Sequence, residues 1–233
     1  MPFSKKTLVI TIITALIVTL FLKLSIWQRH RYHYKKSLEV SFAQEVSAPP
    51  KDLETILKVI QANAYYKIKL TGNYDNRQFL LDNRINTHHQ VGVSVITPFH
   101  LNQGGTILVN RGFLALDKNH HLRVPIAPPQ NTITITGLIM IPAWSFVLGP
   151  IIEPQKIPTW PKWIMRVDPK AASEALQEPL LPYMVFLDKA APDGFEREWQ
   201  PPNFGAARSL AYSFQWIALA ILAIILYWII IKT

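Results

Sequence analysis

Two uncharged apolar runs, one near each end of the 233-residue chain, constrain its fold more than any other feature. Residues 7–22 include no charged side chain, and neither do residues 209–231. An α-helix rises 1.5 Å per residue, so about 20 apolar residues cross the ~30 Å hydrocarbon core of a membrane. The second run meets this length outright. The first meets it by extending to Ile26, with the amine of Lys23 snorkelling outward along its aliphatic stem.

We therefore expect a membrane protein with two transmembrane helices, at residues 7–26 and 209–231, and an extramembrane domain at 27–208. The shortage of charge agrees, since charged residues make up 17% of the chain, against about 25% in an ordinary soluble domain. Two spans place both termini on the same side of the membrane.

The first run begins like a secretory signal, since Lys5 and Lys6 precede it. Its apolar stretch is longer than the roughly 7–15 residues of a signal, and no small-residue cleavage site follows. We expect an uncleaved anchor. Because no Arg-rich and Ser-rich leader precedes the run, a mitochondrial transit peptide is disfavoured, and we expect a bacterial plasma membrane.

The basic residues leave the orientation open. Lys5 and Lys6 precede the first run, while four Lys or Arg residues follow it within the segment 29–36. The positive-inside rule applies to loops below about 60 residues, whereas long domains translocate largely regardless of charge. The formal net charge of +9 comes partly from this segment, and anionic lipid headgroups are its expected partner.

Several classes of chemistry are excluded by what the sequence lacks. The chain has no cysteine, which excludes disulfides, thiolate metal sites and thiol redox chemistry. No phosphate-binding loop, dinucleotide turn, zinc-protease pair or serine elbow is present, so we do not expect an enzyme. No nucleic-acid recognition motif accompanies the positive charge, so we expect no nucleic-acid partner.

The middle segment has the pattern of an α+β domain. Residues 132–139 alternate Thr and Ile, which predicts a strand with one buried face, and shorter apolar runs predict further strands. Asp168 followed by Pro169 predicts a helix over 168–177, and Asp52 begins another. Strands outnumber helices, so we expect a mainly antiparallel or barrel-like sheet between the two spans.

Polar side chains mark one end of the second run. Ser209, Tyr212, Ser213 and Trp216 fall at i, i+3, i+4 and i+7 and share one predicted helix face. Gln215 lies six residues inside the run, ~9 Å deep. An unpaired amide at that depth is costly, so Gln215 should face the first helix, a cofactor or another membrane protein. Helix–helix contact and a functional contact remain open alternatives.

Other candidates lie outside the second run. Trp27 and Gln28, at the end of the first run, are expected to meet the polar face. Arg111 ends an apolar strand, either in a structural ion pair or in a direct functional contact. His30 and His33 lie three apart on a predicted helix and are the only metal-ligand candidates. Neighbouring cations oppose metal binding there, and a basic stripe that faces lipid headgroups is the alternative.

Several stretches, read in chain order between the two apolar runs, resemble one family, the Surfeit-locus-one (Surf-one) assembly factors of cytochrome c oxidase. These stretches are Trp27-Gln28-Arg29, Leu80-Leu81-Asp82-Asn83-Arg84, Gly92-Val93 through Thr97-Pro98, Leu108-Val109-Asn110-Arg111-Gly112-Phe113, Pro192-Asp193-Gly194-Phe195 with Trp199, and Tyr212-x-x-Gln215-Trp216. The resemblance implies an assembly factor for a haem–copper oxidase that helps to place haem a in the catalytic subunit.

Partners and location are also implied by the resemblance. The partners would be the oxidase catalytic subunit, the enzyme of haem a synthesis and membrane lipid. The domain at 27–208 would lie in the periplasm. A cofactor-free membrane scaffold that binds an oxidase subunit during assembly is the alternative function.

Seven residues are candidate contacts with haem or with a partner: Tyr212, Gln215, Trp216, Trp27, Gln28, Arg111 and Arg84. The two arginines suit haem propionates, because guanidinium groups pair well with carboxylates. One departure from the family pattern is Ser209, at a position where bacterial members often carry a histidine proposed as a haem ligand. A serine hydroxyl is a poor iron ligand compared with imidazole, which favours the scaffold.

Overall fold

The computed structural model describes residues 5–61, 64–86, 88–119, 121–122, 125–143, 145–154, 159–197 and 205–232. The chain divides into two compact units. One, the helix pair, comprises Met1–Val40 with Pro201–Thr233, and the other, the barrel domain, comprises Ser41–Gln200. Trp199, part of the family resemblance, lies outside the described residues.

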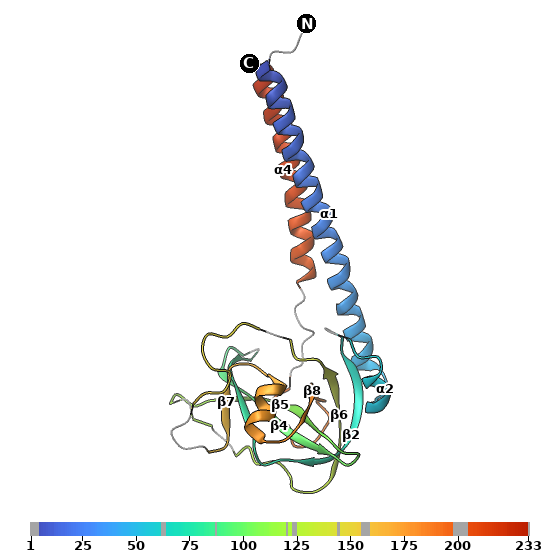
Figure 1. The fold of residues 1–233 in the computed structure, drawn as a ribbon, viewed down its shortest axis with the longest axis vertical. Helices are drawn as coiled ribbons and strands as arrows, with labels where there is room; N and C mark the ends of the chain where they lie inside the picture. Colours follow the sequence, from blue (N-terminus) through green and yellow to red (C-terminus); the bar gives the residue numbers. More distant parts are fainter. Residues whose placement is uncertain are drawn as a thin grey trace. The chain divides into compact units, whose positions relative to one another are not determined.

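The helix pair is built from α1 (Lys5–Ser47) and α4 (Ala206–Lys232). Both helices are long and apolar enough to cross a membrane, as the two apolar runs predicted. They lie side by side along the length of α4 (Figure 1). The helix that begins in the first run continues through the charged segment without a break to Ser47.

A narrow seam joins the two helices. On α4 the deeply buried residues and the half-buried Trp216 are spaced alternately by three and four: Ala206, Ser209, Ser213, Trp216 and Ala220. On α1 the buried Ser25 and half-buried positions follow the same spacing: Thr11, Thr14, Val18, Phe21, Ser25, Gln28, Tyr32 and Lys35. A repeat of 3.5 residues keeps one stripe facing a partner helix, and small residues let the backbones approach.

Eight strands form one sheet in the barrel domain: β1 (Lys51–Asp52), β2 (Tyr66–Tyr74), β3 (Phe79–Ile85), β4 (Val91–Leu101), β5 (Thr106–Ala115), β6 (Ile133–Met140), β7 (Lys162–Ile164) and β8 (Leu180–Leu187). The order is β1-β2-β6-β8-β5-β4-β3-β7, and β2 also pairs with β4. That extra pairing closes β2, β6, β8, β5 and β4 into a ring, with two short helices beside it, α2 (Leu53–Leu57) and α3 (Pro169–Leu176).

The sheet is mixed, which corrects the expectation of a mainly antiparallel sheet. β5 pairs with β8 in parallel, and so do β1 with β2 and β3 with β7. The remaining pairs are antiparallel. Alternation of apolar and polar residues fixes which face of a strand is buried, and it leaves the direction of its neighbour undetermined.

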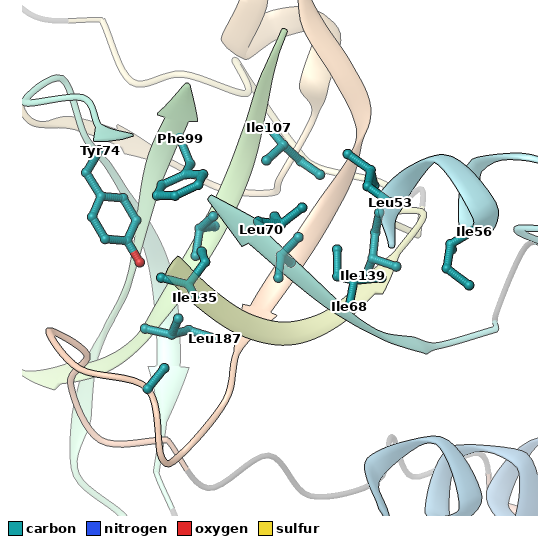
Figure 2. Close-up of a cluster of buried hydrophobic side chains, with 13 residues drawn as sticks. Leu53, Ile56, Ile68, Leu70, Tyr74, Phe99, Ile107, Ile135, Ile139 and Leu187 are labelled. Atoms are coloured by element: carbon teal, nitrogen blue, oxygen red, sulfur yellow. The ribbon is translucent and has the colours of Figure 1, made fainter. Parts of the chain in front are cut away.

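Alternate side chains of the ring strands point inward and form the main core. Ile68, Leu70, Ile135, Ile139 and Leu187 meet there, and α2 adds Leu53 and Ile56 at one end (Figure 2). Each strand residue in this set is less than 5% exposed. Burying one such aliphatic side chain stabilises the fold by about 1.5–3 kcal/mol.

A second core lies on the outer side of the ring, under α3. Ala172 and Leu176 of this helix pack with Phe79, Leu108 and Met184 from the strands. The predicted cap of α3 is confirmed: the Asp168 carboxylate accepts hydrogen bonds from the backbone N–H groups of Lys170 and Ala171, at 3.1 and 3.2 Å. This cap fixes where α3 begins, and therefore which of its faces covers the ring.

An ion-pair cluster ties the end of β2 to the end of α3. The Arg77 guanidinium donates to Asp75 Oδ2 at 2.6 Å, to Glu178 Oε2 at 2.9 Å and to the Leu176 carbonyl at 2.7 Å. His100 Nε2 lies 3.1 Å from Asp75 Oδ2. Burial raises the pKa of the Asp75 carboxyl, but the Arg77 hydrogen bonds and charge outweigh it and hold that pKa below its usual value.

Replacing Arg77 tests this cluster. Asp75 is ionised in the fold at a lower pH than in the unfolded chain, so its ion pair stabilises the protein above about pH 4 and is lost as the pH falls further. We expect Arg77→Met to cost about 1–2 kcal/mol at neutral pH, or about 2–8 °C in melting temperature. The difference from the parent protein should shrink as the pH falls below about 4, where the Asp75 carboxylate becomes protonated.

The measurement is a thermal melt of the purified protein at each pH. Lys36→Met is the control, because it breaks an exposed pair with Glu39 and should change stability by under about 0.5 kcal/mol. A difference that stays constant down to about pH 3 would contradict the assignment to Asp75.

Candidate functional site

Serine pairs hold the seam where α4 begins. Ser25 Oγ and Ser213 Oγ are 3.0 Å apart, and Ser213 Oγ also lies 3.1 Å from the Ser25 carbonyl oxygen. Both side chains are buried. Hydroxyls in this setting bond across two helices and stabilise their association.

Ser209, the position at which the family resemblance implies a histidine, is part of the seam. It is only 3% exposed, and its hydroxyl accepts a hydrogen bond from Lys35 Nζ at 3.0 Å. The same ammonium donates to the Gly205 carbonyl at 3.4 Å. This serine therefore joins the first helix to the second, an arrangement that no sequence motif predicted.

The four polar residues predicted to share a face of α4 do not all lie in the seam. Ser209 and Ser213 lie there, and Trp216 packs its ring 5.5 Å from that of Phe21. Tyr212, however, is 46% exposed. The seam repeats every 3.5 residues, whereas the prediction used a wider stripe that took in Tyr212.

Gln215 lies on the side of α4 away from the seam. Together with Ala211, Ala218 and Leu222 it forms an exposed stripe at i, i+4, i+7 and i+11, here called the free face. Of the three partners expected for Gln215, the first helix is therefore ruled out. A buried amide in lipid needs a hydrogen-bond partner, so a cofactor or another protein remains.

Of the candidate residues on α1, one lies in the seam and the others are exposed. Gln28 is half-buried on the seam repeat, as expected, but Trp27 is 50% exposed, and the Arg31 guanidinium lies 4.9 Å from its ring centre. His30 and His33 are both exposed. Among the described residues, neither belongs to a group of three side chains placed to bind a metal ion.

The one such group found among the described residues is Asp75, His100 and Glu178, which sequence reasoning missed. Asp75 follows β2, His100 lies in β4 and Glu178 follows α3, so no local spacing relates them. Arg77 already supplies the cation between the two carboxylates, at 2.6 and 2.9 Å. The group therefore acts as the structural cluster described above.

Arg111 points into one end of the ring and is 3% exposed. Its guanidinium donates to the Asp193 carbonyl twice, at 2.9 and 2.7 Å, and to the Ile126 carbonyl at 2.8 Å. The rings of Tyr74 and Phe195 lie about 5 Å from its central carbon. Of the two roles left open for Arg111, this geometry provides a structural one, with backbone carbonyls in place of the expected ion pair.

Two stretches that carry the family resemblance meet at Arg111. The backbone of Phe195 donates to the Arg111 carbonyl at 2.8 Å, and Phe113 exchanges two backbone hydrogen bonds with Glu196. Gly112, between them, has φ of +120°, and a Cβ there would lie 2.7 Å from the Glu196 carbonyl oxygen. The segment after β8 thus seals the ring against β5, and only glycine permits so close an approach.

The electrostatics of this end agree with a buried, fully charged arginine. Burial lowers the pKa of Arg111 from its usual value, which still leaves the group charged at neutral pH. Burial also raises the pKa of the Tyr74 phenol to about 12, although the Arg111 charge acts in the opposite direction. Tyr74 is therefore neutral and supplies an aromatic face to the cation.

Arg84 lies on the opposite, outer side of the strand wall. It is exposed at the edge of a cavity of about 340 Å³ that Ser94, Asn110 and Arg166 also line. The two arginines proposed as propionate contacts therefore do not share a site within the barrel domain. Asn110, which precedes Arg111 on β5, points to the opposite face from Arg111 and lines the same cavity as Arg84.

Replacing Arg111 tests whether this residue stabilises the fold or contacts a ligand. Arg111→Met leaves the Asp193 and Ile126 carbonyls without a donor, so we expect a loss of about 3 kcal/mol or more in the free energy of unfolding. Thermal melts of purified protein measure it, with Arg84→Met as the matched exposed control. Unchanged melting of Arg111→Met, together with lost function, would contradict the structural role.

The family of this chain follows from comparison with known proteins. The family model described as "SURF1 family" matches residues 15–221. A SURF1-like protein from Rickettsia bellii is 29% identical over 134 residues, covering 56% of this chain and 53% of that protein. Surfeit locus protein 1 from Gallus gallus is 30% identical over 134 residues, covering 51% of this chain and 43% of that protein.

The chain spans about half the length of the curated relatives it matches, and a third, Surfeit locus protein 1 from Xenopus tropicalis, agrees at 28% identity. The family match begins within α1, ends within α4 and includes the strands that carry the Arg111 end of the ring. The chain belongs to the SURF1 family.

Proposed function

We propose that this chain is an assembly factor for a haem–copper terminal oxidase, cytochrome c oxidase, and that it acts by docking α4 against the catalytic subunit. Membership of the SURF1 family supports an assembly role, as the resemblance implied. The family names suggest an assembly factor and not an enzyme, so the proposed role is that of a binding protein.

The observation that carries the docking step is the free face of α4. Gln215 presents an amide on the lipid-facing side of an apolar helix, between Ala211 and Ala218. Small residues let a second helix approach closely, and the amide then gains the hydrogen bond that lipid cannot supply. Tyr212, also exposed, adds a hydroxyl beside this face.

The proposal includes a role in haem a insertion, for which the chain offers two routes. In the first, the protein carries the haem itself. In the second, it holds the catalytic subunit as a cofactor-free scaffold. The contact between Lys35 and Ser209 favours the second, because the hydroxyl at the family's histidine position is buried and already bonded. Serine is also a poor iron ligand.

We propose a bacterial plasma membrane as the location, with the barrel domain in the periplasm. Two helices of spanning length support membrane insertion, and a bacterial relative supports the cell type. The periplasmic side rests on the resemblance alone. Fusion of a reporter that is active only in the periplasm, inserted at the exposed Lys118, tests the orientation.

Enlarging a residue of the free face tests the docking step. Ala218→Phe should block close approach, and Gln215→Leu should remove the interhelical hydrogen bond, worth about 1 kcal/mol or roughly a five-fold loss in affinity. The measurement is the amount of oxidase catalytic subunit that co-purifies with the tagged protein.

Ile221→Phe is the matched control, because Ile221 is also exposed on α4 but lies off the free face. Equal recovery of the catalytic subunit with Ala218→Phe and Ile221→Phe would overturn docking through this face.

An absorption spectrum distinguishes the two routes for haem a. For the scaffold route we expect no Soret band in the protein purified from cells that make haem a. Ser209→His removes the Lys35 contact and adds an imidazole. A band in this variant alone would indicate that the helix pair can bind haem once a histidine ligand is present. A band in the parent protein would contradict the scaffold and direct the search for a ligand to His30, His33 and Tyr212.

A further inference from the structure

The barrel domain has a cavity on the outer side of its strand wall that the proposed function does not use. Its volume is about 340 Å³. Strands β3, β4, β5, β6 and β8 form its floor, and Pro142, Ala143, Ser145 and residues 166–167 lie along its edge. Pockets for small molecules range from about 300 to 1,000 Å³, so this one suits a single substituted ring or a short chain, not a macrocycle.

Two buried polar side chains in the cavity have hydrogen-bonding groups without a partner. Asn110 is 3% exposed, and its Oδ1 accepts from the Gly112 backbone N–H at 3.0 Å, which fixes the orientation of the amide. Its Nδ2 donates to no described residue. Ser94 is 8% exposed, and its hydroxyl likewise has no partner within the described ranges. Both atoms are accessible from the cavity and are not among the fully buried unpaired atoms of the described residues, so both are available to a ligand in it.

Charge favours an anion in this cavity. Arg84, at the edge, makes no hydrogen bond or ion pair with a described residue, and Asp82 acts on it only as a nearby charge. Arg166, also at the edge, donates to Asp168 at 2.8 Å and to the Ser145 carbonyl at 2.6 Å. No carboxylate is among the described residues that line the cavity.

The rest of the lining is apolar. Leu81, Met140, Met184 and Phe186 cover the floor. Methionine side chains adapt to ligands of varied shape, and the phenyl ring offers a flat apolar surface. A ligand that satisfies both halves of the cavity has one anionic group and an apolar body.

We propose that this cavity is a binding site for a small apolar carboxylic acid. The carboxylate accepts from the Arg84 guanidinium, from the Asn110 amide and from the Ser94 hydroxyl, while the apolar body lies on the methionines. A guanidinium and an amide donor suit the planar carboxylate, and charge-assisted bonds of this kind are the strong ones. The site stands independently of the docking face on α4.

The test is isothermal titration calorimetry on the full chain in lipid nanodiscs, with empty nanodiscs subtracted. The probe is 3-phenylpropionate, and its neutral isostere, 3-phenylpropanamide, is the control ligand. We expect the acid to bind at least about ten-fold more tightly than the amide, because hydrogen bonds to a charged group are the larger contribution.

Three variants locate the site. Asn110→Asp keeps the acceptor for Gly112 but replaces the donor with a negative charge, and should weaken binding of the acid by more than about ten-fold. Arg84→Gln should weaken it by about ten-fold, and Ser94→Ala by a smaller factor. Lys118→Gln removes an exposed positive charge elsewhere in the barrel domain and should leave binding unchanged.

Thermal melts establish that each variant is folded, and Arg84→Gln carries the test if Asn110→Asp is not. The proposal is overturned if no binding of the acid is measured, if acid and amide bind equally, or if Arg84→Gln and Ser94→Ala bind the acid as well as the parent protein does. Binding of the acid and co-purification of the oxidase subunit are separate measurements. The ligand-site proposal can therefore fail without contradicting the proposed assembly function.

Discussion

The barrel domain depends on one buried cation. The Arg111 guanidinium lies inside the ring, where transfer from water is costly unless its N–H groups are bonded. The carbonyls of Asp193 and Ile126 and, at 3.4 Å, the side-chain oxygen of Gln78 accept these hydrogen bonds. The two carbonyls thereby fix the loop before β6 and the segment after β8 against β5. Two stretches that carry the family resemblance therefore converge on a structural requirement at this end of the ring.

Side chains alternate between the two faces of β5, so a stabilising residue and a cavity residue are neighbours in the chain. Arg111 points inward and holds the ring, whereas Asn110, its neighbour, points outward into a cavity with an unpaired amide nitrogen. Side chains of a strand face opposite sides in turn, so adjacent residues of one motif serve two purposes. The inner residue is expected to stabilise the domain, and the outer one lies in the proposed ligand site.

On α4 two opposite helix faces have different environments: one packs against α1, and the other is exposed. Serines and alanines occupy the seam, where close approach to α1 and hydrogen bonds such as that between Ser25 and Ser213 stabilise the pair. Gln215 lies on the other side, unpaired within the helix pair, as expected of a contact with a further protein. Ser209, at the family's histidine position, is bonded to Lys35 within the seam.

The sequence by itself determined local elements: the two apolar helices, the strand expected at 132–139 and found at 133–140, and the start of α3 at its Asp168 cap. These follow from periodicity and capping, which act over a few residues. Only the tertiary structure decided the parallel pairing of β5 with β8, the bond between Lys35 and Ser209, and the exposure of Tyr212. Each joins residues far apart in the chain or depends on which stripe of a helix meets its partner, and no local pattern encodes such a choice.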